Sequence, residues 1–295
     1  MMTRREWMAG VAMISGTMVF GRKARGAREE FEGLQAQVWT IEKTSGGRLG
    51  VAVLDTGSGT RFGYRADERF PMCSTFKVLA VGEVLKRVDQ GKESLDRVVH
   101  YTKSDVLEWA PTTKLHVDTG MTVGALCEAA IALSDNTAAN LLLKTVGGPA
   151  GVTAFARGLG DGITRLDRNE PTLNEALPGD ARDTSSPLAM LDDLQKLVLG
   201  GVLTTDSRHR LTTWLIADQT GVRQLRAGFP AGWRVGDKTG SGSNGTANDV
   251  AIAWPASGKA LLTAVYLTGA KLDRAHQESA IASLGNAVAA HFADR

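Results

Sequence analysis

The segments that favour β-strands fall into two groups that lie far apart in the chain. Residues 49–55 and 60–64 are rich in apolar residues and are joined by a Thr-Gly-Ser-Gly turn, which predicts a β-hairpin. Strand patterns return at 233–239, 248–254 and 260–268. The residues between the two groups favour helices joined by short polar loops. A single sheet must therefore be assembled from both ends of the chain, with a helical block inserted between them.

Helical periodicity covers both ends and the middle of the sequence. Apolar residues recur at helical spacing in six segments: 28–43, 123–131, 137–146, 187–199, 207–216 and 273–292. We therefore expect an α+β fold, or α/β sandwich, in which a five-stranded antiparallel sheet is flanked by the terminal helices and carries an inserted all-α domain. The expected α/β domain comprises residues 28–70 and 217–295. The expected all-α domain comprises residues 71–216, with a long active-site loop at about 165–183.

The first 27 residues have the composition of an export signal. Arg4 and Arg5 precede a mildly apolar run from Ala9 to Phe20, and small residues follow at Gly26-Ala27. Paired arginines before bulky apolar residues resemble the twin-arginine type of signal. A disordered basic tail is the alternative interpretation. The signal predicts a periplasmic or secreted protein, and we expect the mature protein to be a monomer.

The overall composition excludes several classes of function. The 34 basic and 32 acidic residues nearly cancel, so the chain lacks the charge of a nucleic-acid-binding protein. Cys73 and Cys127 lie far apart outside any C-x-x-C pattern, and the five histidines are scattered, so no zinc-like cluster is present in the sequence. No run reaches the roughly 20 apolar residues of a membrane helix. We expect no metal, no cofactor, no nucleic-acid partner and no membrane partner once the signal is removed.

One short polar stretch leads directly into an apolar segment with helical spacing. Ser74 precedes Val78, Leu79 and Val81 by about one turn, and Lys77 follows Ser74 by three residues. On a helix these two polar side chains lie on the same face. A serine hydroxyl becomes a nucleophile when a neighbouring base takes its proton, and a buried lysine amine can be that base. An isolated S-x-x-K is more often a helix cap followed by a solvated charge.

Three further motifs follow in the same chain. Ser134-Asp135-Asn136 begins a predicted helix, and Lys238-Thr239-Gly240-Ser241 lies on the first of the late strands. Glu170-Pro171-Thr172-Leu173-Asn174 lies in a segment from Leu166 to Ser186 without sustained periodicity, and such a long loop in a compact domain is usually functional. Each motif alone has a structural interpretation as an N-cap, a strand end or a solvated charge. Four motifs in this order favour a common site.

With these motifs the chain resembles the class A serine β-lactamases over nearly everything after the signal segment. The resemblance implies that Ser74 is the acylated nucleophile and that Lys77 is its basic neighbour. It implies that Glu170 and Asn174 hold the hydrolytic water. The acylation base, either Lys77 or Glu170 acting through water, stays open. The resemblance also implies substrate-handling roles: a proton relay to the departing lactam nitrogen at Ser134, an amide contact at Asn136, and carboxylate binding at Lys238, Thr239 and Ser241, with Gly240 in the same strand.

The expected chemistry agrees with these roles. Attack on a strained amide builds an oxyanion, which the backbone N–H groups of Ser74 and Ser241 could hold. The position of Ser74 at a helix N-terminus adds a favourable dipole. The ester that results needs a second base to activate water, and Glu170 in the loop would supply it.

Other similarities are looser, and some positions depart from the family. Arg168 and Asp183 correspond to an ion pair across the neck of the loop, Arg165 and Asp167 could assist it, and the Glu170-Pro171 bond would be cis. Trp109 falls where the family has an aromatic at the rim of the pocket, although a core tryptophan is the alternative. The arginines that grip the substrate carboxylate in many relatives are replaced by Gln224 and Ala247, and the neighbouring Arg223 and Arg226 cannot be oriented from sequence. Because neither cysteine has its family partner, both are expected to be free.

The expected function is hydrolysis of the β-lactam amide of penicillins and cephalosporins through a serine acyl-enzyme, which gives antibiotic resistance. Its partners would be the small-molecule substrate and a catalytic water. The alternative enzyme is a D,D-peptidase or penicillin-binding protein, which shares the other three motifs but does not need the deacylation residues Glu170 and Asn174. A non-hydrolytic penicillin sensor, which becomes acylated and stays so, is the alternative from another class.

Overall fold

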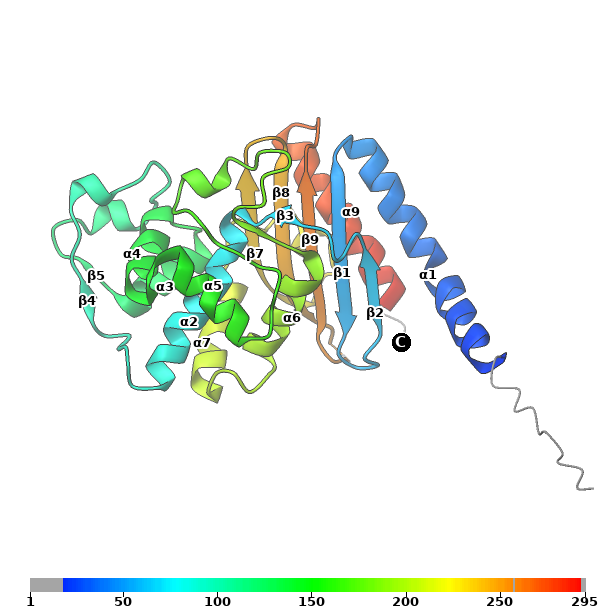
Figure 1. Cartoon of the computed structure of the whole chain (residues 1–295), viewed down its shortest axis with the longest axis horizontal. Coiled ribbons are helices and arrows are strands. Elements are labelled where there is room, and N and C mark those ends of the chain that lie inside the picture. Colours follow the sequence, from blue (N-terminus) through cyan, green and yellow to red (C-terminus); the bar gives the residue numbers. More distant parts are fainter. Residues whose placement is uncertain (1–17, 257, 293–295) are drawn as a thin grey trace, which may run out of the picture.

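A central antiparallel sheet divides the molecule into two layers (Figure 1). The computed structural model describes residues 18–256 and 258–292. The strand order is β2-β1-β9-β8-β7, so strands from the two ends of the chain pair at the centre, with Val51 of β1 opposite Val265 of β9. The predicted α+β fold is confirmed. The strands are β1 (Arg48–Asp55), β2 (Arg61–Tyr64), β7 (Arg234–Gly242), β8 (Thr246–Trp254) and β9 (Leu261–Thr268).

Alternate residues of each strand contribute to two separate hydrophobic cores. Val51 and Val53 of β1 face the core under α1 (Met18–Ser45), α8 (Leu225–Gly228) and α9 (Arg274–Phe292). Ala52 and Leu54 face the opposite core, which the sheet shares with the helical block. This alternation follows from the two-residue period of a strand. Both faces of the sheet are covered, which explains why its strands read as nearly continuous apolar runs.

The inserted helical block packs against one face of the sheet (Figure 1). The helix α5 follows α4 directly and was not predicted, because the left-handed Gly147 (φ 90°) between them reads as an ordinary break. The helix α6 contacts β1 and β9 and so links the block to the sheet. The helices of the block are α2 (Lys77–Asp89), α3 (Val123–Ala132), α4 (Asn136–Val146), α5 (Gly148–Gly158), α6 (Pro187–Val198) and α7 (Thr205–Ile216).

Short elements complete the connections around this block. Four 3-10 helices are present in the described chain: η1 (Cys73–Phe76), η2 (Lys103–Asp105), η3 (Thr113–Leu115) and η4 (Thr172–Asn174). Two small antiparallel pairs were not predicted: β3 (Phe70–Pro71) with β6 (Thr184–Ser185), and β4 (Val98–Val99) with β5 (Met121–Thr122). The β3–β6 pair joins the segment before Ser74 to the end of the long loop, and so closes that loop at its neck.

The first helix differs from the sequence prediction. We expected it to begin at residue 28, but α1 begins at Met18, inside the segment predicted to be the export signal. Arg4 and Arg5 lie outside the described residues. In the parts of the chain that the structure describes, no helix combines the length and hydropathy needed to cross a membrane.

Candidate active site

Ser74 lies in a tight turn that precedes a buried helix. The 3-10 helix η1 contains Ser74 and continues directly into α2, which begins at Lys77. Cys73, just before the serine, has φ 46°, a left-handed conformation that is uncommon for a residue with a side chain. Such conformations cluster at functional sites. The hydroxyl of Ser74 is not a helix cap, because neither η1 nor α2 has a side-chain N-cap hydrogen bond.

The strand β7 passes very close to this turn. A Cβ atom at Gly240 would lie 2.7 Å from the carbonyl oxygen of Met72, so a side chain at this position would collide with backbone. At Gly242 a Cβ would lie 2.7 Å from Cys73 Sγ and 2.8 Å from Asn174 O. The absence of side chains at Gly240 and Gly242 therefore lets β7 lie against the turn that contains Ser74 and against the long loop.

The ammonium of Lys77 is completely buried beside Ser74. Its Nζ donates a hydrogen bond to Ser74 Oγ at 2.9 Å and forms an ion pair with Glu170 Oε1 at 3.1 Å. It also donates to Asn136 Oδ1 at 2.7 Å and to the carbonyl oxygen of Ser134 at 2.8 Å. The alternative interpretation of Lys77 as a solvated charge is wrong. With Ser134 Oγ at 3.3 Å, five acceptors surround the three ammonium hydrogens and hold this nitrogen in one place.

Burial changes the basicity of Lys77. Removal from water lowers the pKa of the Lys77 ammonium below that of a free lysine, while the negative charge of Glu170 opposes part of this shift. The ammonium therefore loses its proton more easily than that of a free lysine, which is the direction that a base beside Ser74 requires.

Glu170 approaches the same hydroxyl from the long loop. Ser74 Oγ donates to Glu170 Oε1 at 3.2 Å, and Asn174 Nδ2 donates to Glu170 Oε2 at 2.5 Å. Asn140 of α4 fixes the backbone of Glu170, because its side chain accepts from Glu170 N and donates to Glu170 O, both at 2.9 Å. Glu170 is only 4% exposed, which excludes a solvated loop charge. The predicted cis Glu170-Pro171 bond is present.

Ser134 links the two lysines of the site. Lys77 Nζ lies 3.3 Å and Lys238 Nζ 3.1 Å from Ser134 Oγ, so both can donate to this hydroxyl. Ser134 itself has φ 55° and lies before the N-cap of α4. That cap is Asp135, whose carboxylate accepts from Ala138 N at 2.9 Å, so Asp135 has a structural role. Burial lowers the pKa of Lys238 to about 8, although the charge of Asp218 opposes the shift.

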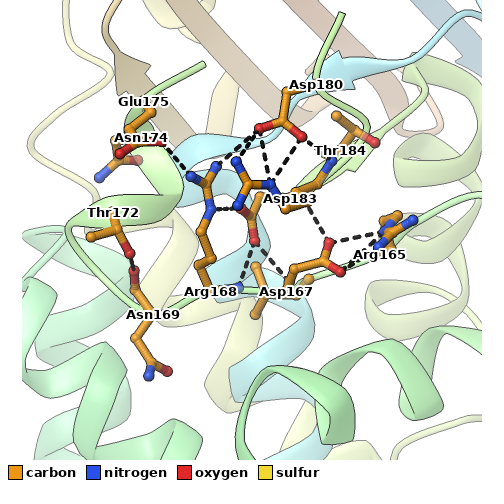
Figure 2. Close-up of polar contacts among 12 residues, drawn as sticks. Arg165, Asp167, Arg168, Asn169, Thr172, Asn174, Glu175, Asp180, Asp183 and Thr184 are labelled. Carbon is orange, nitrogen blue, oxygen red and sulfur yellow. Dashed lines mark hydrogen bonds and ion pairs between the residues drawn. The ribbon is translucent and has the colours of Figure 1, made fainter. Parts of the chain in front are cut away.

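One buried ion pair crosses the neck of the loop, as Figure 2 shows. Arg168 Nε donates to Asp183 Oδ2 at 2.6 Å, and Arg165 pairs with Asp167 on the outside of the loop. Asp183 is 1% exposed and also accepts from the backbone N–H groups of Asp167 and Arg168. Arg168 Nη1 reaches Glu175 at 2.5 Å. The predicted pairing of Arg168 with Asp183 is confirmed.

A cavity of about 630 Å³ opens in front of Ser74. Trp109 is 56% exposed, lies at this cavity and donates from Nε1 to Leu133 O at 3.1 Å, so it is not a core tryptophan. In the described chain, no group of three or more His, Cys, Asp or Glu side chains is placed to hold a metal ion. The cavity is lined by Ser74, Trp109, Pro111, Leu133, Ser134, Asn136, Asn174, Gln219, Thr220, Thr239, Ser241 and Arg274.

The structure gathers all the residues that the four motifs predicted, and it adds others. Gln219, Thr220 and Arg274 line the cavity, and none of them belongs to a motif identified in the sequence. The two arginines that could not be oriented both point elsewhere. Arg226 pairs with the buried Asp237 of β7, and Arg223 is 77% exposed at the surface. Cys73 and Cys127 are buried and free, as predicted.

Comparison with known proteins gives the same result as the geometry. A model of the β-lactamase enzyme family matches residues 33–292. β-Lactamase AST-1 of Nocardia asteroides is 52% identical over 79% of this chain and 75% of its own length. The carbapenem-hydrolyzing β-lactamase KPC of Klebsiella oxytoca is 49% identical over 82% of this chain and 83% of its own length.

Solved structures agree as well. The last common ancestor of Gram-negative bacteria class A β-lactamase superposes with a TM-score of 0.87 and 58% identity, covering 88% of this chain and 99% of that one. A serine hydroxyl in contact with a buried lysine and a buried loop carboxylate agrees with this similarity over most of the chain. The chain belongs to the β-lactamase enzyme family, among its class A serine enzymes.

Proposed function

We propose that this protein hydrolyses the β-lactam amide of penicillins and cephalosporins through an ester on Ser74 and so confers antibiotic resistance. The observation that carries the proposal is the position of one hydroxyl between two bases. Ser74 Oγ lies 2.9 Å from Lys77 Nζ and 3.2 Å from Glu170 Oε1. An enzyme that only becomes acylated needs one base, whereas turnover needs a second one to activate water.

Acylation uses Ser74, its neighbouring base and Ser134. Ser74 attacks the lactam carbonyl and loses its proton to the acylation base, either Lys77 or Glu170 through a water. The backbone N–H groups of Ser74 and Ser241 hold the oxyanion. Ser134 Oγ, within 3.3 Å of both lysine nitrogens, then delivers a proton to the departing lactam nitrogen. Asn136 and the Lys238-Thr239-Gly240-Ser241 strand bind the substrate, with Trp109 at the rim.

Deacylation uses the loop. Glu170, held by Asn174 at one oxygen, takes a proton from a water that attacks the Ser74 ester. The ester bond breaks, Ser74 recovers its proton and the ring-opened acid leaves. The reaction consumes one water per lactam and requires no redox partner.

Steady turnover of a chromogenic cephalosporin tests this proposal. A β-lactamase gives continuous hydrolysis far beyond one equivalent of substrate. A penicillin-binding protein or a non-hydrolytic sensor gives one equivalent of adduct and then stops. The second result would refute the proposed function.

The proposed setting is outside the cytoplasm. We base it on Arg4-Arg5 and the apolar run that follows, which would direct a folded monomer through the twin-arginine route. Replacing both arginines by lysine should leave active enzyme in the cytoplasm. Undiminished export of that variant would contradict the twin-arginine route, and a dimer in analytical ultracentrifugation would contradict the monomer.

We also propose the domain division expected above, with residues 28–70 and 217–295 as one unit and 71–216 as the other. The two hydrophobic cores support it in outline. The contact of α6 with β1 and β9 crosses the proposed boundary. Native-state hydrogen exchange in which α6 opens with the sheet rather than with α2–α5 would move that boundary.

A further inference from the structure

The cavity in front of Ser74 contains an arginine that no motif predicts. Arg274 is the first residue of α9, and it lines the cavity together with Thr220, Thr239 and Ser241. Among the described residues that line this cavity, it is the only cation. The helix α9 packs against β8 on the face of the sheet opposite the helical block, and its first residue reaches the cavity.

Two neighbours hold the guanidinium of Arg274 in place. Its Nε donates to Glu278 Oε1 at 2.9 Å, one turn further along α9. Its Nη2 donates to the side-chain oxygen of Gln224 at 3.0 Å, with the amide oriented so that its nitrogen donates to Asn248 O at 3.1 Å. Gln224 is completely buried, so it forms a fixed support.

The remaining donors of Arg274 are available to a ligand. In the part of the chain that the structure describes, Nη1 of Arg274 has no hydrogen-bond partner. The side chain is 42% exposed, so an anion in the cavity can reach it without displacing the protein. A guanidinium keeps its charge at all ordinary pH values and can bind a carboxylate through two parallel N–H groups.

The other cations near the cavity are less suited to a substrate anion. Arg226 donates to Asp237 and to the carbonyl oxygens of Leu215 and Ile216, which occupies its guanidinium. Lys238 is buried and already donates to Ser134 Oγ and Thr239 O. Since the pKa of Lys238 is lowered to about 8, part of its population is neutral in mildly alkaline solution.

We propose that Arg274 binds the carboxylate of the β-lactam substrate, through Nη1 and beside the hydroxyls of Thr220, Thr239 and Ser241. This inference rests on the proposed function, since penicillins and cephalosporins carry such a carboxylate next to the lactam ring. Gln224 and Glu278 hold the guanidinium in the orientation that presents Nη1 to the cavity.

The test compares a chromogenic cephalosporin acid with its methyl ester. Arg274→Ala should lower kcat/KM for the acid by about 10- to 100-fold, the usual effect of losing hydrogen bonds to a charged group. It should lower kcat/KM for the ester by less than about threefold, because the ester has no charge to bind. For the acid, kcat/KM of Arg274→Lys should lie between the values of the parent and the alanine variant. Lysine keeps the positive charge but cannot bind the carboxylate through two parallel N–H groups.

A matched control lies beside α9, just before α8. Arg223→Ala removes one positive charge whose nearest acid is also Glu278, at 4.0 Å, but Arg223 does not line the cavity. This variant should leave both substrates unchanged. If Arg274→Ala fails to fold, Arg274→Gln keeps a similar length and an amide donor toward Gln224, and the same acid-to-ester ratio is measured.

The outcomes separate the inference from the proposed function. An equal loss for acid and ester in Arg274→Ala would show a structural role and overturn the carboxylate assignment. An unchanged rate for the acid would overturn it as well. If the parent protein does not turn over the acid at all, the proposed function fails, and the carboxylate assignment that rests on it fails with it.

Discussion

Two buried pairs of ionisable side chains border the same long loop, and they differ in their balance of charge. Lys77 and Glu170 lie 3.1 Å apart with both side chains fully buried, so a positive charge faces a negative one. Asp161 precedes the loop in the chain and Asp193 follows it in α6, and their two carboxyl groups lie side by side. Lys196, which pairs with Asp193 at 3.8 Å, is 40% exposed.

The difference shows what burial demands of each pair. Charges removed from water must be compensated, and Lys77 with Glu170 achieve this by ion pairing and hydrogen bonding. Two adjacent carboxylates repel each other, so one of them keeps its proton. Burial and the charge of Asp161 raise the pKa of Asp193 to about 8. For Asp161, burial works toward a higher pKa, but hydrogen bonds from Thr164 and the backbone outweigh it and the pKa is lowered.

The largest expected effect comes from removing the carboxylate of the first pair. Glu170→Ala leaves Ser74, Lys77 and the backbone donors in place, so acylation should continue, at a lower rate if Glu170 also serves as the base for that step. Deacylation should fall by about 10²–10⁴-fold, the usual contribution of a general base. Intact-protein mass spectrometry after mixing with a penicillin should show one ligand mass on Glu170→Ala for minutes or longer.

Ser74→Ala is the matched control for this result. It removes the nucleophile and keeps Lys77 and Glu170, so no covalent adduct should form with any β-lactam. Turnover of Glu170→Ala at the parent rate would show that the carboxylate is not required. In that case the Lys77–Glu170 pair would be structural, as the Asp161–Asp193 pair is.

The second pair should be visible in the dependence of stability on pH. In the folded protein the pKa of Asp193 is raised to about 8, whereas in the unfolded chain it is near the ordinary value of 3.8. Between these values the unfolded chain binds fewer protons, so the free energy of unfolding falls as pH rises and levels off above pH 8. At about 1.4 kcal/mol per pH unit, the decrease between pH 5 and pH 8 reaches at most about 4 kcal/mol.

Asp193→Asn should remove this slope. The amide keeps the shape of the acid and can donate to the ionised Asp161, so the variant should melt higher than the parent at pH 8 and nearly equally at pH 5. Asp192→Asn is the control, because its side chain is 36% exposed and pairs with Arg61 at the surface. Melting curves of the two variants that run parallel between pH 5 and pH 8 would show that Asp193 is not a buried proton carrier.

Sequence analysis could find the first pair and not the second. Ser74 and Lys77 are three residues apart on one helical face, and the motif with Glu170 lies in a loop that interrupts an otherwise periodic chain. Each motif alone was ambiguous, and it was the order of all four motifs, with the family resemblance, that predicted a common site. Asp192 and Asp193 are adjacent acids in a helix with apolar residues on both sides. Which of them points inward is decided by how α6 packs against the sheet, and no local pattern contains that information.

The same reasoning applies to the architecture and to the cavity. The five strands were predicted because their apolar runs are bounded by turns, whereas α5 was missed because Gly147 and Gly148 resemble a loop. Arg274 was missed because it meets Ser241 and Thr239 only after α9 folds back onto the sheet. Contacts between residues far apart in the chain depend on tertiary packing, which motif spacing does not describe.

The smallest expected effect concerns the clamp that supports the loop between the two pairs (Figure 2). Arg168→Ser leaves Asp183, which is 1% exposed, with only its backbone donors, so the free energy of unfolding should fall by roughly 2–3 kcal/mol. The loosened loop carries Glu170, so penicillin turnover should fall too. Arg165→Ser is the matched control, since Arg165 pairs with Asp167 while 43% exposed, and surface pairs contribute little. If both variants melt and turn over alike, the neck does not position Glu170, and the short bonds from Asn140 and Asn174 are sufficient to hold it.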